Sequence, residues 1–311
     1  MFQQSRYLGV DVSKDTLVVA FERQCWQLPN SKEGFRQLLA KIKKQAGVIH
    51  VACESTGAYH LPMCLALQEG GLAVTICNAA QIRYFGLSEG VLAKNDPLDA
   101  ALIERFANSK RLPADPPLKR EQIALGELIK HRQHLVEAAK VQRTYRQQTL
   151  DATVRREIDR SIKVLEKRIE ALRVQLQKKV EANPSWKRKM EVLMSQKGVG
   201  FLTAIVLLVK MPELGSLNRG QSAALAGVAP YDDDSGQDER HRSIRGGRLE
   251  VRNALYMAAL TASRCNPFLK ALYQRLIKER KPPKVALTAV MRRLIVYLNA
   301  LLKADAQTPP A

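Results

Sequence analysis

The stretch from Tyr7 to Phe21 constrains the fold more than any other part of the chain, because it sets an acid inside an apolar strand. Apolar residues occupy every second position from Leu8 to Val12, and a polar turn leads into a second apolar run at 17–21. A carboxylate within a core strand is unfavourable unless it is paired or binds a cation. Asp11 is therefore either paired with a basic side chain or a metal ligand.

Three more carboxylates occupy comparable positions at the ends of expected core elements. Glu54 follows the apolar strand 48–53, and Asp96 and Asp99 lie three residues apart at the start of a helix. Mg²⁺ prefers oxygen ligands and keeps several of its waters. Two such ions about 4 Å apart are a common device for in-line phosphoryl transfer. We therefore expect a Mg²⁺ cage formed by Asp11, Glu54, Asp96 and Asp99.

The strings around these acids resemble a known family. GVDVSKDTL at 9–17, ACESTGAYH at 52–60 and KNDPLDAALI at 94–103 are similar to DEDD transposases of bacterial insertion sequences, the "one-ten" family, which includes Piv-type DNA invertases. The resemblance implies an N-terminal RuvC- or ribonuclease-H-like domain and an enzyme that cleaves and transfers DNA strands. It also implies a structured guide RNA that specifies donor and target DNA.

A second informative stretch is Gly-rich and charged. LAGVAP at 225–230, the pair Ser235-Gly236 and SIRGG at 243–247 resemble the second domain of the same family, in which a serine is the nucleophile. The position that matches this serine is Ser235, and Ser243 in the same loop is the second choice. Three acids at 232–234 precede Ser235 directly and would repel a phosphate unless they are neutralised.

The charge of the chain indicates a nucleic-acid partner. The 50 Lys and Arg residues outnumber the 30 Asp and Glu residues, giving a net charge of +20, which favours DNA or RNA ahead of an anionic membrane. More than half of this excess lies in residues 236–303. A Gly-x-Gly turn at 198–200, ahead of a helix, offers backbone N–H groups to a phosphate. The basic residues expected to contact nucleic acid are Lys94, Lys197, Arg240, Arg242, Arg245 and Arg248.

The 311 residues suffice for more than one core, and we expect an α/β part followed by an all-α part. Residues 1–117 should form the mixed sheet with its helices, 118–182 a helical coiled-coil stalk, and 183–311 a helical transposase domain with the serine loop. Apolar residues recur in steps of three and four from Ile158 to Val180, which approximates a heptad seam. Such a seam packs against a helix of the same chain or of a second protomer. We expect a homo-oligomer, either a dimer or a tetramer.

Other classes of protein fit the sequence less well. The longest apolar run, Phe201 to Val209, is too short to span a bilayer, and we expect a cytoplasmic protein without a membrane partner. The five cysteines lack C-x-x-C spacing, which indicates reduced thiols and no zinc site. Two rival functions stay open. One is a RuvC-like junction-resolving nuclease that hydrolyses DNA with water, and the other is a non-catalytic nucleic-acid-binding protein.

Overall fold

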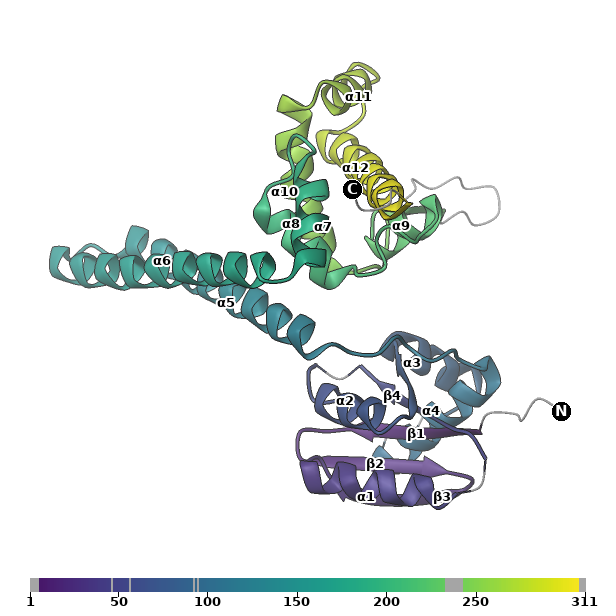
Figure 1. The fold of residues 1–311 in the computed structure, drawn as a ribbon. Coiled ribbons are helices and arrows are strands. Elements are labelled where there is room, and N and C mark those ends of the chain that lie inside the picture. Colours follow the sequence, from purple (N-terminus) through teal and green to yellow (C-terminus); the bar gives the residue numbers. More distant parts are fainter. Residues whose placement is uncertain are drawn as a thin grey trace. The chain divides into compact units, whose positions relative to one another are not determined.

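The computed structural model describes residues 6–45, 47–55, 57–91, 93, 95–232 and 243–307. The chain divides into two compact units, Met1–Arg120 and Glu121–Ala311, and each has its own hydrophobic core. The first unit is mixed α/β, and the described part of the second is almost entirely helical (Figure 1). The chain thus follows the expected order of an α/β part and an all-α part.

One five-stranded mixed sheet, in the order β3-β2-β1-β4-β5, organises the first unit. The first three strands form an antiparallel meander, whereas β4 pairs in parallel with β1 and β5 pairs in parallel with β4. The strands are β1 (Arg6–Val12), β2 (Thr16–Phe21), β3 (Gln24–Pro29), β4 (Ile49–Glu54) and β5 (Ala73–Cys77). The strand that carries Asp11 is therefore the central one.

Helices cover both faces of this sheet. Side chains along β1 point alternately to the two faces, so this strand contributes to the hydrophobic clusters on both sides. Leu8 and Val10 lie in one cluster with residues of α1 (Lys32–Lys43) and α2 (Leu61–Glu69). Tyr7 lies in a second cluster with residues of α3 (Ala79–Ser88) and α4 (Asp96–Lys110). Asp11 is an even number of residues from Tyr7, so it belongs to the face that α4 covers.

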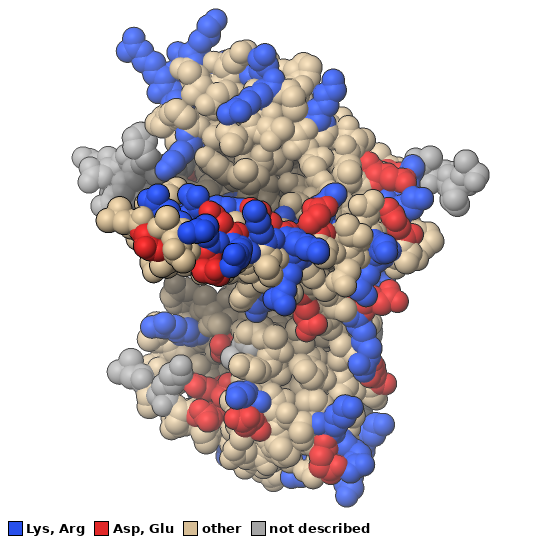
Figure 2. Space-filling view, turned by 90° about the vertical axis from the view of Figure 1, so that its left-hand side faces the viewer, with Lys and Arg blue, Asp and Glu red and all other residues tan. Residues whose placement is uncertain are grey.

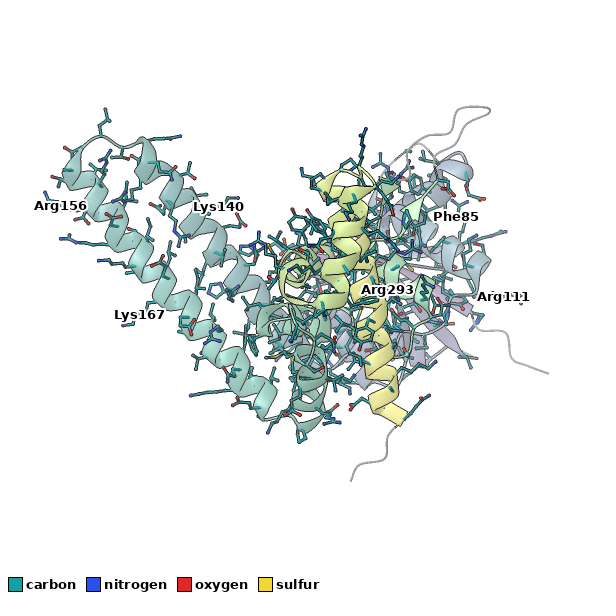
Figure 3. All side chains as sticks on the ribbon, turned by 90° about the horizontal axis from the view of Figure 1, so that it is seen from above. Phe85, Arg111, Lys140, Arg156, Lys167 and Arg293 are labelled. Carbon is teal, nitrogen blue, oxygen red and sulfur yellow. The ribbon has the colours of Figure 1, made fainter. Side chains whose placement is uncertain are left out.

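The second unit begins with a helical hairpin in which α5 (Arg120–Gln148) and α6 (Ala152–Glu181) run side by side (Figures 1 and 3). Ion pairs cross between the helices, from Arg143 to Glu166 at 2.7 Å and from Arg146 to Asp159. The predicted seam runs along α6, and its last two residues share a core cluster with residues of α5, α7 and α8. Its residues are buried at both ends and half-buried in the middle: Ile158, Ile162, Leu165, Ile169, Leu172, Leu176 and Val180. The partner of this seam is thus a helix of the same chain.

The long helix α12 (Pro283–Gln307) contacts α7, α9, α10 and α11, and α8 packs against α7 and α10. By length and composition, α12 is the one described helix that could cross a membrane, but half of its most apolar stretch is buried inside this unit. The other elements are α7 (Pro184–Met194), α8 (Phe201–Lys210), α9 (Arg219–Leu225), β6 (Pro230–Tyr231), β7 (Ser243–Ile244), α10 (Leu249–Cys265) and α11 (Pro267–Lys278).

Candidate active site

Asp11 and Glu54 lie side by side on two parallel strands. β1 and β4 pair in a register that sets Val10 opposite Cys53, so the next residue of each strand, Asp11 and Glu54, shares the next level of the sheet. Adjacent strands are about 4.8 Å apart. Because both strands end within a residue of this level, the two carboxylates meet at the carboxyl edge of the sheet.

Asp96 and Asp99 come from the first turn of α4. Asn95 caps this helix, since its Oδ1 accepts a hydrogen bond from the backbone N–H of Leu98 at 2.9 Å. Pro97 is suited to the first turn, where a missing N–H leaves no bond unmade. The helix dipole stabilises acidic side chains at this end. The local sequence therefore starts the helix just before Asp96, so both acids lie in its first turn.

Gly9 allows α4 to approach β1 closely. A Cβ atom at Gly9 would lie 2.3 Å from the carbonyl oxygen of Ala100 and 2.5 Å from the backbone nitrogen of Glu104, far inside a normal contact distance. Gly9 and Asp11 share one face of the strand, because they are two residues apart. The bare backbone at Gly9 therefore lets α4 lie against β1, with its first turn near Asp11. Sequence reasoning missed this residue, although a glycine inside a strand often marks a close backbone approach.

The charges of the other three acids act on Asp11. Asp11 is half-buried, and its pKa is raised to about 6, first by burial and then by the negative charges of Asp99, Asp96 and Glu54. A hydrogen bond from the backbone N–H of Val12 acts in the opposite direction. Each of the other three acids thus lies near enough to Asp11 to disfavour its ionised form. The other three predicted carboxylates thus lie within electrostatic range of Asp11.

This set of side chains suits a hard divalent cation. Carboxylate oxygens are the ligands that Mg²⁺ prefers. Burial raises the pKa of Asp11 most, and a cation would offset the further rise caused by the charges of the other three acids. Among the residues that the structure describes, no three Asp, Glu, His or Cys side chains converge closely enough to surround one ion.

The predicted nucleophile lies in a segment, residues 233–242, outside the described residues. The strands on either side of it, β6 and β7, pair in antiparallel fashion with Tyr231 opposite Ser243. Ser243, the second choice of nucleophile, is exposed on β7. The predicted site residues outside the described part of the chain are Ser235, Lys94, Arg240 and Arg242.

The described basic residues have different surroundings. Lys197 is exposed in the turn between α7 and α8, and Arg245 is exposed after β7, where its Nε donates to the Oγ of Ser243 at 3.3 Å. Arg248 instead forms a two-pronged ion pair with Glu213, at 2.6 and 2.8 Å, and donates to the carbonyl oxygen of Lys210. This pairing gives Arg248 a structural role that its place in the sequence did not indicate.

Comparison with known proteins identifies the family. Residues 8–155 match the DEDD domain of the IS110 family, described as "Transposase", and residues 190–274 match "Transposase IS116/IS110/IS902 family". The pilin gene-inverting proteins of Moraxella bovis and Moraxella lacunata are 27% and 28% identical over 308 residues, spanning 96% of this chain and 95% of each relative. The "Insertion element IS110 uncharacterized 43.6 kDa protein" of Streptomyces coelicolor is 31% identical over 135 residues, 43% of this chain and 32% of that protein. The chain therefore belongs to the IS110 transposase family and is a DNA transposase or recombinase.

Proposed function

We propose that this protein cuts and rejoins DNA strands with a Mg²⁺-binding tetrad and a serine nucleophile. The tetrad consists of Asp11, Glu54, Asp96 and Asp99, and the nucleophile is Ser235. The observation that carries the tetrad is the placement of the other three acids near Asp11, because their charges add to the effect of burial in raising its pKa to about 6. A divalent metal also fits the DEDD transposase family to which the chain belongs.

The first unit supports a RuvC- or ribonuclease-H-like identity. Its sheet joins an antiparallel meander to two parallel strands in the order β3-β2-β1-β4-β5, which fits the layout that the sequence resemblance implies. The acids come from the central strand β1, its parallel neighbour β4 and the first turn of α4. This is an arrangement in which a phosphate could be held at the edge of the sheet by a cation and approached from solvent.

A bound divalent cation would polarise a phosphate oxygen and offset the charge that develops during phosphoryl transfer. The chain itself would hold the carboxylates in place through the register of β1 and β4 and through the contact of Gly9 with α4. In the serine step, the Oγ of Ser235 forms a bond to a backbone phosphorus atom, and one P–O ester bond of the DNA breaks. The serine proton passes to a base, and the departing oxygen takes up a proton. The phosphoserine link conserves a phosphoester for rejoining.

The proposed substrate is DNA, both donor and target, and the proposed partner is a structured guide RNA. The net charge of +20 supports a polyanionic partner, whereas the guide RNA rests on the family resemblance alone. The Moraxella relatives are named as gene-inverting proteins. Inversion of a DNA segment is therefore a proposed outcome of recombination alongside transposition.

A denaturing gel with labelled DNA tests both parts of this mechanism. The substrate is DNA that carries the ends of the element, supplied together with the RNA that copurifies with the protein. In Mg²⁺, we expect the wild type to give a protein-linked DNA band. Ser235→Ala should lose this band, and the matched variant Ser243→Ala should retain it. Asp11→Asn should lose cleavage but keep DNA binding, because a lost carboxylate weakens the hold on the cation without reducing the basic surface.

Three outcomes contradict the mechanism in different ways. If the wild type released free cleaved ends without a protein-linked band, a RuvC-like nuclease that uses water would replace the serine reaction. Full cleavage by Asp11→Asn in Mg²⁺ would show that cleavage does not depend on the proposed tetrad. Binding without any cleavage in Mg²⁺ or Mn²⁺ would favour a nucleic-acid-binding protein with an inactive site.

A further inference from the structure

The second unit has an open pocket of 530 Å³ whose lining contains none of the four acids and neither of the two candidate serines. Ligand pockets in proteins span roughly 300–1,000 Å³, so this one is large enough for a small organic group. Its walls come from the turn after α7, the start of α11 and the middle of α12. Five of its lining residues have polar or aromatic side chains: Gln196, Asn266, Phe268, Arg293 and Tyr297.

Flat, exposed surfaces dominate this pocket. The Phe268 side chain is 60% exposed and that of Tyr297 48% exposed, although aromatic rings are usually buried. The guanidinium carbon of Arg293, which Figure 3 labels on α12, lies 5.2 Å from the centre of the Phe268 ring. A planar guanidinium over an aromatic ring is a favourable cation–π contact. Together these groups form a platform on which another flat group can stack.

At the pocket, the side-chain amides of Asn266 and Gln196 each use one of their two polar groups in a hydrogen bond within the protein. The Oδ1 of Asn266 accepts the backbone N–H of Leu269 at 3.3 Å, which leaves its NH₂ group as a donor. The Nε2 of Gln196 donates to the Oγ of Ser195 at 3.3 Å, which leaves its Oε1 as an acceptor. The free ends make no hydrogen bond within the described part of the chain. A donor and an acceptor of this kind match the edge of a nucleobase.

The chain segment that supplies most of the pocket lining is rich in positive charge. Residues 251–304 contain 11 Lys and Arg but one acid, Glu279. Lys and Arg side chains gather at the top of Figure 2, the end of the second unit where α11 lies. Arg293 forms no ion pair with any carboxylate among the described residues, so its charge is available to a ligand. This charge favours a polyanion over an apolar or basic peptide.

We propose that this pocket binds the base of an unpaired nucleotide, which stacks against Phe268 and Tyr297 while its phosphates contact the surrounding cations. Base stacking on exposed aromatic rings beside Arg and Lys is a general way to bind single-stranded nucleic acid. The inference rests on the proposed function in one respect, that the protein handles nucleic acid. It adds a binding site for an unpaired base, formed by residues separate from the acids and the serine.

The test compares duplexes that differ in one base. Two fluorescent DNA duplexes carry a one-nucleotide bulge, which is adenosine in one and an abasic nucleotide in the other, and a matched RNA pair is made. Because both members of a pair have the same charge, a difference in affinity reports the base alone. We expect the wild-type full-length protein to bind the adenosine bulge about 5- to 150-fold more tightly, the range expected for stacking of one base.

Variants assign this difference to the pocket. Phe268→Ala with Tyr297→Ala should remove the preference while leaving the affinity for the abasic duplex unchanged. Arg293→Lys keeps the charge but loses the planar guanidinium, and should reduce the preference. The control is Tyr256→Ala, which removes an exposed ring of α10 outside the pocket and should keep the preference. Thermal unfolding of each variant shows whether the unit remains folded.

The outcomes separate this inference from the proposed function. Equal wild-type affinity for adenosine and abasic bulges in both DNA and RNA would refute base binding by the pocket and leave the proposed function intact. A preference that survives in the folded double variant would also refute base binding by the pocket. Failure of the wild type to bind any of the four duplexes would overturn the proposed function together with the pocket. A preference in the DNA pair assigns the base to DNA, and a preference in the RNA pair assigns it to RNA.

Discussion

Replacing Gly9 by alanine should push α4 away from the sheet. The added Cβ would lie 2.3 Å from the carbonyl oxygen of Ala100 and 2.5 Å from the backbone nitrogen of Glu104, whereas ordinary contacts begin near 3.4 Å. The obstructing atoms belong to the backbone, so no side-chain rotation can relieve the clash. Relief requires a separation of about 1 Å between strand and helix, and overpacking of this kind costs about 1–3 kcal/mol of unfolding free energy.

The displacement should affect the acids more than the fold. Asp96 and Asp99 begin the helix that must retreat, whereas Asp11 stays on the strand. A misplacement of about 1 Å in a catalytic site can cost about 100-fold in rate. For Gly9→Ala we therefore expect DNA cleavage about 100-fold below the wild type, weaker Mn²⁺ binding, and a protein that still folds.

Urea denaturation measures the loss of unfolding free energy. Titration calorimetry measures Mn²⁺ binding, and the cleavage gel measures the rate of DNA cleavage. The matched control is Gly220→Ala in α9, where an added Cβ would meet nothing closer than the Oδ1 of Asn218 at 3.5 Å. That variant should keep wild-type cleavage and gain up to about 1 kcal/mol from helix propensity. If Gly9→Ala had the stability, Mn²⁺ affinity and cleavage rate of the wild type, the positioning role of Gly9 would be refuted.

Two further predictions concern the second unit. If protomers associate through the hairpin, Val141→Lys with Tyr145→Lys should weaken the oligomer in light scattering, because these side chains are 64% and 53% exposed on α5. Leu165→Asp with Leu172→Asp should also melt the hairpin in circular dichroism, and a monomeric wild type with nucleic acid bound would contradict the oligomer. Burial raises the pKa of Glu213, but the hydrogen bond from Arg248 outweighs it and holds the pKa below its ordinary value. A lowered folded-state pKa stabilises the protein above the unfolded value of about 4.3, and this contribution is lost as the pH falls through the folded value. Glu213→Gln should therefore lower stability at pH 7 and flatten its decline toward pH 3 in urea titrations.

The four acids of the proposed tetrad could be singled out from the sequence because of where they lie in the expected elements. Asp11 interrupts an apolar strand, Glu54 ends another, and Asp96 and Asp99 open a helix, so the residues stand out before any fold is known. The proximity of Asp11 and Glu54 then follows from the parallel pairing of β1 with β4. The role of Gly9 could not be read in the same way. It depends on the backbone of a helix about 90 residues later, which no local pattern encodes.

The hairpin shows a similar division between local and long-range information. The heptad pattern from Ile158 to Val180 predicted a helix partner but not its identity, since either a second protomer or the same chain satisfies the pattern. The chain reverses at 149–151, between α5 and α6. Asp151 marks the start of α6, because its Oδ1 accepts the backbone N–H groups of Thr153 and Val154. This cap is visible in the sequence, but it was not enough to show that the helices fold back on one another.

The distribution of charge depends on structure even more strongly. A count over the sequence supplies only the sum, in which every Lys and Arg has equal weight. In the described part of the second unit beyond α6, four acids are each paired with a nearby cation: Glu213 with Arg248, Glu250 with Lys210, Glu279 with Arg275 and Asp305 with Arg188. Such pairs are nearly neutral at a distance, so the long-range field comes from the cations outside them. Arg248 therefore contributes little to attracting DNA, whereas Arg293, which stacks on Phe268, keeps its full charge for a phosphate.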